Sequence, residues 1–147
     1  MKKKDYSITF LFDQPAADVF QAICNVRGWW SQTVKGRSQK LNDSFVYEHK
    51  PYHRSKQRVI EVVPDKKIVW LVTESNIYFV EDPNEWLDTE ISFVLSKQKS
   101  KTKLVFTHHG LTSQKACFEN CAKGWDYYLE ESLARLITTG KGRPDKK

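Results

Sequence analysis

Two histidines stand in strand-like stretches of the chain, where their imidazole groups could take part in acid–base chemistry. His108 alternates with Leu104 and Phe106, and alternate side chains of a strand point to one face, so all three should point inward. His49 follows Tyr47 at the same spacing and is a second inward candidate. Imidazole is the side chain most often used to move protons near neutral pH.

Three roles are open to an inward histidine in this chain. Beside Tyr47 or Tyr128 it could exchange protons with a polyketide-like substrate. It could contact the polar group of a bound ligand, or it could be a core residue bonded to a backbone carbonyl, which is the commonest arrangement. By the same alternation His109 should face solvent, and His53 is expected in a solvated turn.

Complete catalytic and metal-binding motifs are missing from the sequence. It contains no Gly-x-Ser-x-Gly, no Walker-type loop and no His-Glu-x-x-His. Cys117 and Cys121 are four positions apart on a predicted helix, but two ligands do not make a metal site. Together with Cys24, we expect three buried free thiols, no metal, no cofactor and no assigned catalytic residue.

Aromatic residues form a second group of candidates, for binding rather than catalysis. The chain has five Trp, six Tyr and eight Phe. Trp29 and Trp30 follow Gly28 after a short helix, where they could plug the end of the core, contact a ligand at a pocket mouth, or do both. Gly124 lies within a predicted helix, where glycine costs about 1 kcal/mol relative to alanine. Its presence favours the close approach of a strand or, less commonly, of a ligand.

Hydrophobic periodicity predicts the elements that position these residues. Period-two alternation predicts strands at 6–12, 44–50, 56–63, 67–74, 87–96 and 102–109, with a weak strand near 33–37. A short helix should begin at Asp13-Gln14-Pro15, and a long amphipathic helix should span about 113–139. The stripe of that long helix consists of Phe118, Cys121, Ala122, Trp125, Leu129, Leu133 and Leu136. The short turns indicate an antiparallel meander, so we predict an α+β fold.

Length, charge and composition restrict the class of protein. With 147 residues, 39% of them hydrophobic, the chain should form a single domain, 1–147, around one core. The net charge of +6 lies in the two ends, 1–4 and 141–147, which we expect to be flexible. The segment 5–140 is neutral overall, so nucleic-acid binding is not expected. The sequence has neither an apolar run of about 20 residues nor a signal-peptide cleavage pattern, so we expect a cytoplasmic protein without membrane insertion.

The order of the elements and four motifs are similar to those of a known family. The motifs are Asp13-Gln-Pro-Ala-Ala-Asp-Val-Phe20, Trp29-Trp30, Thr102-Lys-Leu-Val-Phe-Thr-His-His-Gly110 and Gly124-Trp125-x-x-x-Leu129-x-x-x-Leu133. Over about residues 5–140 the chain resembles the START-like helix-grip superfamily (SRPBCC). Within it, the chain is most similar to the branch named for the activator of the ninety-kilodalton heat-shock chaperone ATPase.

That resemblance implies a curved antiparallel sheet of about six or seven strands, wrapped around a long C-terminal helix, with a short helix after the first strand. Members of the superfamily include ligand carriers, cyclases and cochaperone domains. In the full activator, the matching part is the second domain, and the partner-binding first domain has no counterpart in this sequence. A sheet curled around a helix does not mesh with it everywhere, so a pocket is expected between them.

The leading hypothesis is a small soluble protein that binds an apolar or aromatic small molecule, or a lipid, in a cavity between the sheet and the C-terminal helix. Two alternatives remain open, an interaction module of the chaperone-cofactor type and a cyclase- or hydrolase-like enzyme that uses an inward His or Tyr. The residues expected to line the cavity are Trp29, Trp30, Tyr47, His49, Trp70, Phe93, Phe106, His108, Trp125, Tyr128 and Leu129. The expected partner is a hydrophobic small molecule or lipid, with a chaperone as the alternative.

Overall fold

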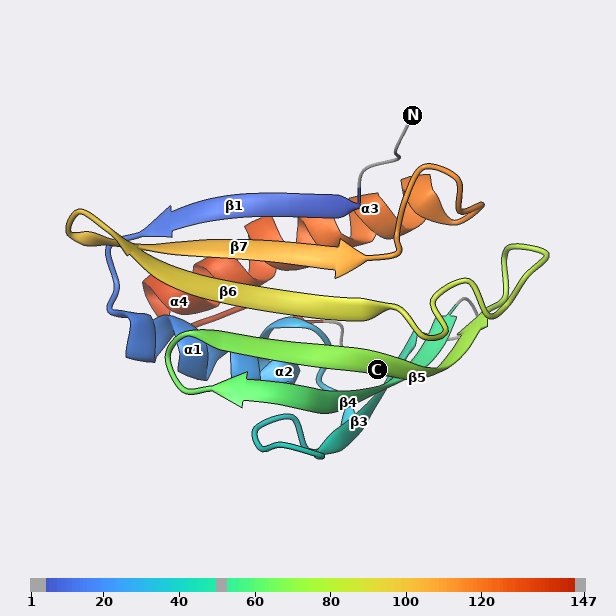
Figure 1. Ribbon diagram of the computed structural model, residues 1–147, viewed down its shortest axis with the longest axis horizontal. Helices are drawn as coiled ribbons and strands as arrows, with labels where there is room; N and C mark the ends of the chain where they lie inside the picture. The colour runs from blue at the N-terminus through green and yellow to red at the C-terminus, as the bar shows by residue number, and fades with distance from the viewer. Residues whose placement is uncertain (1–4, 50–52, 145–147) are drawn as a thin grey trace.

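One antiparallel sheet of seven strands runs through the part of the chain that the computed structural model describes, residues 5–49 and 53–144 (Figure 1). Its strands are β1 (Tyr6–Phe12), β2 (Lys35–Gly36), β3 (Ser44–His49), β4 (His53–Val63), β5 (Lys67–Ile77), β6 (Glu90–Gln98) and β7 (Lys101–His109). Their order in the sheet is β1-β7-β6-β5-β4-β3-β2. The strands from β2 to β7 therefore form the predicted meander, and β1 pairs with β7 at the far edge.

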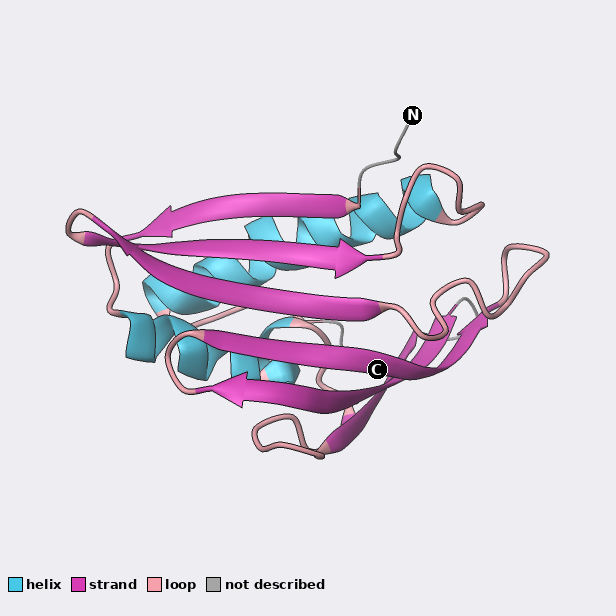
Figure 2. Ribbon diagram, viewed as in Figure 1, coloured by secondary structure: helices cyan, strands magenta, loops and turns pink. Residues whose placement is uncertain are grey.

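Helices cover one face of this sheet. Two short ones, α1 (Ala16–Cys24) and α2 (Val26–Trp29), follow β1. The long helical run after β7 comprises α3 (Phe118–Asp126), a π-helical segment η1 (Tyr127–Leu133) and α4 (Ala134–Thr139). Figure 2 shows this run crossing behind the strands as one continuous rod. The predicted α+β arrangement, with a sheet against a long C-terminal helix, is confirmed.

Strand limits agree with the predicted ones, with differences at the ends. β1 has the predicted limits, while β4 and β5 are longer than predicted because their ladder continues to the pair His53 and Ile77. β4 also contains two register shifts, and such bulges bend a strand and increase its twist. β6 begins at Glu90 instead of 87, because the preceding residues form a turn in which the Thr89 N–H bonds to the Trp86 carbonyl.

The long helix begins at Phe118, so the prediction of a start near 113 was wrong. Residues just before it form turns instead, with the Lys115 N–H bonded to the Thr112 carbonyl. The carboxylate of Glu85, from the β5–β6 connection, accepts hydrogen bonds from the N–H groups of Ala116 (2.8 Å) and Cys117 (2.9 Å). Cys117 is the N-cap of α3 and Ala116 precedes it, so Glu85 ties the start of the helix to the β5–β6 connection, where a carboxylate is favourable.

The π-helical segment changes which residues of the helix face the sheet. The buried apolar positions are Cys121, Trp125, Leu129, Leu133 and Ile137, a spacing of four residues throughout. A regular α-helix repeats every 3.6 residues, and a π segment has more residues per turn. The predicted stripe therefore holds as far as Leu133, but Ile137 takes the buried place expected for Leu136.

Residues after the last helix pack back against the domain. The Ser132 hydroxyl donates to the Trp29 carbonyl (2.6 Å) and accepts the N–H of Arg143 (2.7 Å). A Cβ on Gly142 would lie only 2.2 Å from the Gly28 carbonyl oxygen, so only glycine permits this approach. Of the two ends expected to be flexible, the structure describes only 141–144 of the second, and residues 1–4 and 145–147 lie outside the described residues.

Aromatic rings dominate the core between the sheet and the helices. The largest fully buried side chains include Trp29, Trp30, Trp70, Trp125, Phe45, Phe93 and Phe106. All three cysteines are buried and free, as predicted. Within the described residues, no helix combines the length and apolarity needed to cross a membrane.

Candidate functional site

A cavity of about 400 Å³ lies where the ends of β3 and β4 face the helical run. The residues that line it are Trp30, Tyr47, His49, His53, Phe79, Trp86, Asn120, Cys121, Gly124, Trp125 and Tyr128. They come from the turn after α2, the β3–β4 pair, the β5–β6 connection, α3 and η1. The volume is in the range of small-molecule sites.

Stacked rings form the wall of the cavity. Trp30 stacks on Tyr47 with ring centroids 4.4 Å apart and also contacts Trp125 at 5.1 Å. Trp86 stacks on the same Trp125 at 5.7 Å. These contacts join the turn after α2, the sheet, the β5–β6 connection and the C-terminal helix, so the rings of the wall are packed against one another.

Polar groups are few in this lining, and within the part of the chain that the structure describes none belongs to an Asp, Glu, Lys or Arg side chain. The hydroxyl groups of Tyr47 and Tyr128 lie 2.9 Å apart and hydrogen-bond to each other. The π-helical segment places Tyr128 opposite β3 for this contact. Such segments often occur at functional sites.

His53 is part of the cavity wall, and the prediction that it is a solvated turn residue was wrong. It begins β4, pairs with His49 and Ile77, and packs edge-on against Trp86 with centroids 4.4 Å apart. Burial, reinforced by the nearby His49, lowers the pKa of His53 to about 3, so the ring is neutral at pH 7. Its Nε2 atom is buried without a hydrogen-bond partner among the described residues.

Gly124 borders the cavity from α3. A Cβ at this position would contact only the Tyr128 ring, at 4.0 Å. No strand therefore packs closely against Gly124, and the favoured explanation of this glycine as a strand-packing residue was wrong. Space exists beside it because it faces the cavity.

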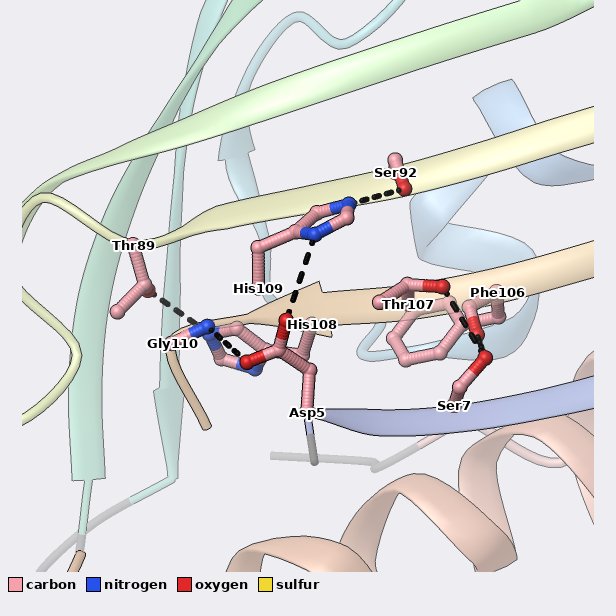
Figure 3. A network of polar contacts seen from close by, with 9 residues as sticks. All are labelled: Asp5, Ser7, Thr89, Ser92, Phe106, Thr107, His108, His109 and Gly110. Atoms are coloured by element: carbon pink, nitrogen blue, oxygen red, sulfur yellow. Dashed lines mark hydrogen bonds and ion pairs between the residues drawn. The ribbon is translucent and has the colours of Figure 1, made fainter. Parts of the chain in front are cut away.

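His108 points inward as predicted and is fully buried, but it does not line the cavity. Figure 3 shows its hydrogen bond to Thr89, 2.8 Å from Nε2, and its Nδ1 accepts the indole N–H of Trp125 at 3.1 Å. Burial, reinforced by the nearby His53, lowers the pKa of His108 to about 3. Both ring nitrogens are thus engaged, and His108 is a satisfied core residue whose partners are side chains instead of a backbone carbonyl.

His109 faces the opposite side of β7 and is exposed, as predicted. Its Nε2 lies 2.9 Å from the Ser92 hydroxyl, and its Nδ1 lies 3.7 Å from the carboxylate of Asp5 (Figure 3). Asp5 also accepts the N–H of Gly110 at 2.9 Å. This surface network joins β1, β6 and β7 outside the cavity.

Cys117 and Cys121 form a hydrogen-bonded pair of thiols, and Cys121 lines the cavity. A hydrogen bond between the two thiols raises the pKa of Cys117 and lowers that of Cys121, so any proton loss would begin at Cys121. Among the described residues, no group of three or more His, Cys, Asp or Glu side chains could hold a metal ion.

The structure divides the predicted lining residues into two sets. Trp30, Tyr47, His49, Trp125 and Tyr128 border the cavity. Trp29, Trp70, Phe93, Phe106, His108 and Leu129 lie in the packed core beyond it. Trp29, for example, is fully buried and donates its indole N–H to the Ile23 carbonyl, so it plugs the core.

Six lining residues were not among those predicted: His53, Phe79, Trp86, Asn120, Cys121 and Gly124. For Gly124 and Cys121 the sequence carried a signal, a glycine within a helix and an apolar position on its stripe. Trp86 and Phe79 belong to the β5–β6 connection, which has no periodicity to indicate which side chains turn inward.

The fold and the cavity together define a class of protein, an α+β helix-grip domain with a pocket lined by aromatic rings. The chain belongs to the family described as Activator of Hsp90 ATPase homolog 1-like protein, whose model matches residues 13–138. The resemblance inferred from the sequence motifs is thereby confirmed. No curated protein matches the chain.

Several solved structures share the fold at low sequence identity. The Aha1 dimer from Colwellia psychrerythraea has a TM-score of 0.76 at 20% identity, and the match covers 95% of this chain and 99% of that one. Protein SSP2350 from Staphylococcus saprophyticus has a TM-score of 0.70 at 15% identity, with 97% and 98% of the two chains covered. DynU16, a putative protein in the dynemicin biosynthetic locus, has a TM-score of 0.68 at 15% identity, with 96% of this chain and 50% of that one covered.

Proposed function

We propose that this protein binds an apolar or aromatic small molecule, or a lipid, in the cavity between the sheet and the C-terminal helix. The observation that carries the proposal is the composition of the wall, which includes six aromatic side chains and, among the described residues 5–49 and 53–144, no Asp, Glu, Lys or Arg. Water in such a cavity finds few hydrogen-bond partners, so an apolar guest is favoured there.

Gly124 is a second support for binding. Glycine within a helix destabilises it by about 0.5–1 kcal/mol relative to alanine, and no close contact in the structure requires it. A residue that lowers stability and keeps space open beside a pocket fits a requirement for that space. Gly124→Ala should therefore raise the free energy of unfolding by about 0.5–1 kcal/mol and weaken ligand binding.

An entrance for the ligand is provided by the exposed part of the rim. Phe79 lines the cavity while 39% of its surface remains accessible to solvent. Asn120, on the first turn of α3, is likewise both exposed and in the lining. We propose that a ligand enters on the exposed side of the wall to which these two residues belong.

The experiment is a search for a bound molecule followed by titration. Protein purified gently from its own cells is examined by native mass spectrometry for a co-purified mass. The same protein is then titrated with a panel of lipids and aromatic compounds while tryptophan fluorescence is followed, because Trp30, Trp86 and Trp125 all border the cavity. The absence of both a bound mass and a spectral change over a broad panel would contradict the proposal.

A pair of variants separates the cavity from the surface. Gly124→Leu fills the space beside Tyr128 and should reduce the affinity of any compound found by at least tenfold. Lys123→Leu adds the same side chain at the neighbouring exposed position, which does not line the cavity, and should leave that affinity unchanged. Equal affinity in the two variants would place the binding site elsewhere.

A second candidate is an interaction module that acts on a heat-shock chaperone, and it is favoured by the family model. The test adds the purified protein to the ninety-kilodalton chaperone and measures the rate of ATP hydrolysis. A rate that increases with added protein supports this candidate, and a rate indifferent to it excludes activation. The Gly124→Leu variant should act like the wild type here, because the cavity is not the surface in question.

We also assign the protein to the cytoplasm. Cys24, Cys117 and Cys121 are all free thiols, and free thiols persist in a reducing compartment. Fractionation of the native cells with an antibody to the protein tests this assignment, and recovery from the extracellular medium would contradict it.

A further inference from the structure

A second cavity, the basic cleft, lies between the turn that joins α1 to α2 and the connection from β2 to β3 (Figure 1). Its volume is about 280 Å³, and its charged lining residues are Arg27, Arg37, Lys40 and Asp43. None of the described residues that line it also lines the cavity with the aromatic wall. The segment 5–140 is neutral overall, so three cations on one cleft are a local concentration of positive charge.

The three cations of the basic cleft have no counter-ion in the part of the chain that the structure describes. No carboxylate there forms an ion pair with Arg27, Arg37 or Lys40. Asp43 supplies the only carboxylate of the described lining, and its Oδ2 already accepts the backbone N–H groups of Gln39 (3.2 Å) and Lys40 (2.9 Å). The described lining therefore has an excess of two positive charges.

The guanidinium group of Arg27 is held in place by neutral acceptors. Its Nε donates to the Val34 carbonyl at 2.7 Å, and its Nη2 donates to the Gly36 carbonyl at 3.0 Å. A guanidinium group has five N–H donors, so three of them stay available for another partner. Because two hydrogen bonds already fix this long side chain, it loses less conformational freedom when it binds an anion.

The charge and the lining of the basic cleft limit the kind of group that fits it. A planar guanidinium fork matches the oxygen atoms of a phosphate group. A phosphate monoester carries a charge of about −1.5 to −2 at pH 7, which is opposite to the excess charge of the described lining and nearly equal to it. No Phe, Trp or Tyr belongs to that described lining, so it offers no surface on which nucleobases could stack.

We infer that the basic cleft binds the phosphate group of a phosphate monoester. Arg27 and Arg37 hydrogen-bond to the phosphate oxygen atoms, and Lys40 adds positive charge beside them. The phosphate group can belong to a soluble molecule or to the headgroup of a lipid such as phosphatidic acid, and the chemistry of recognition is the same for both. The inference does not depend on the ligand proposed for the aromatic cavity.

The test measures the binding of glycerol 3-phosphate by equilibrium dialysis at constant ionic strength, with glycerate as the carboxylate for comparison. Arg37→Gln removes one cation of the cleft, and the Arg37 side chain has no hydrogen bond to the described residues that its loss would break. Lys35→Gln is the matched control, because it removes the same charge from an exposed residue that does not line the cleft.

Arg37→Gln should weaken the binding of glycerol 3-phosphate at least about tenfold, the effect of losing a hydrogen bond to a charged group. Lys35→Gln should weaken it by no more than about twofold, because exposed charges are screened by salt. Glycerate should bind the wild type at least about tenfold more weakly than glycerol 3-phosphate. Equal losses in the two variants, or glycerate bound as tightly as glycerol 3-phosphate, would overturn the inference.

Two measurements locate the site and identify the source of the phosphate group. On addition of glycerol 3-phosphate, the amide NMR signals of Gly36, Gln39 and Lys40 should shift, and shifts confined to the lysine-rich turn between β6 and β7 would overturn the inference. Co-flotation with phosphatidylcholine vesicles only when they contain phosphatidic acid, lost in Arg37→Gln, would assign the phosphate group to a lipid. Binding of glycerol 3-phosphate without co-flotation would assign it to a soluble molecule, and failure of both probes to bind would overturn the inference.

Discussion

The indole nitrogen of Trp125 lies 3.1 Å from Nδ1 of His108, and this contact determines the protonation of the imidazole ring. Indole N–H is only a donor, so Nδ1 must accept and the proton of the neutral ring must be on Nε2. Nε2 then donates to the hydroxyl of Thr89 at 2.8 Å, and Thr89 donates to the Trp86 carbonyl at 2.6 Å. The chain of hydrogen bonds runs in one direction and leaves His108 without a free lone pair for proton transfer.

Replacing His108 should therefore destabilise the protein. His108→Phe keeps a ring of similar size but leaves the Trp125 N–H and the Thr89 hydroxyl each without one partner, at an expected loss of about 2–4 kcal/mol in the free energy of unfolding. Urea denaturation followed by fluorescence measures this change. The control, His109→Phe, alters an exposed residue and should shift the free energy by at most about 1 kcal/mol. Similar effects of the two variants would contradict the one-directional network.

Stability should also fall in mild acid because two histidines are buried in the neutral form. The pKa values of His53 and His108 are lowered from 6.5 to about 3. Between these values the unfolded chain binds protons that the folded protein does not, so the free energy of unfolding decreases as the pH falls from about 6.5 towards 3. Each histidine contributes a slope of up to about 1.4 kcal/mol per pH unit.

The slope is measured by urea denaturation at several pH values between 7 and 4. In His108→Gln, where the amide can still accept from Trp125 and donate to Thr89, the slope should be lower than in the wild type by up to about 1.4 kcal/mol per pH unit. At pH 7 both histidines are mostly neutral in the folded and in the unfolded chain, so they lower the free energy of unfolding little. Parallel curves for the two proteins would show that His108 takes up its proton as easily in the folded protein as in the unfolded one.

The carboxylate of Glu85 should contribute to the free energy of unfolding, although the residue lies in the connection between β5 and β6. Glu85→Ala removes the acceptor of two backbone N–H groups at the start of α3, and a loss of about 1–2 kcal/mol is expected, as for other helix caps. Hydrogen exchange of the Ala116 and Cys117 amides should accelerate in the same variant. Glu81→Ala, at an exposed position of the same connection, is the matched control and should change neither quantity.

The elements of the fold were predictable because each carries its own periodicity. Alternation along β1 predicted its limits, and along β7 it predicted the last residue, the first to within one position and the inward direction of His108. The change from Leu136 to Ile137 on the helix stripe was not predictable, because a π-helical segment has no sequence signature that distinguishes it from an α-helix. The helix start was also missed, since the residue bonded there, Glu85, is 31 positions from Ala116 in the sequence.

The candidate site was less predictable than the fold. Periodicity shows which face of an element is buried but not how far along that face the packing is complete, so Phe93 and Phe106 were grouped with Tyr47 although they lie in the solid core. Trp86 and Phe79 reach the cavity from a connection whose path depends on long-range contacts. His53 was assigned to a turn because the pairing that extends β4 depends on Ile77 of another strand.

The close approach of Gly142 to Gly28 has a practical meaning for anyone who shortens this chain. The last helix ends at Thr139, which makes a cut after Gly140 look harmless. Such a cut would remove the N–H that Ser132 accepts and the Arg143 carbonyl to which the Tyr127 hydroxyl donates, and it would open the flank of α2 to water. The smallest stable fragment should therefore retain residues up to Arg143, and a tag is best attached beyond that point.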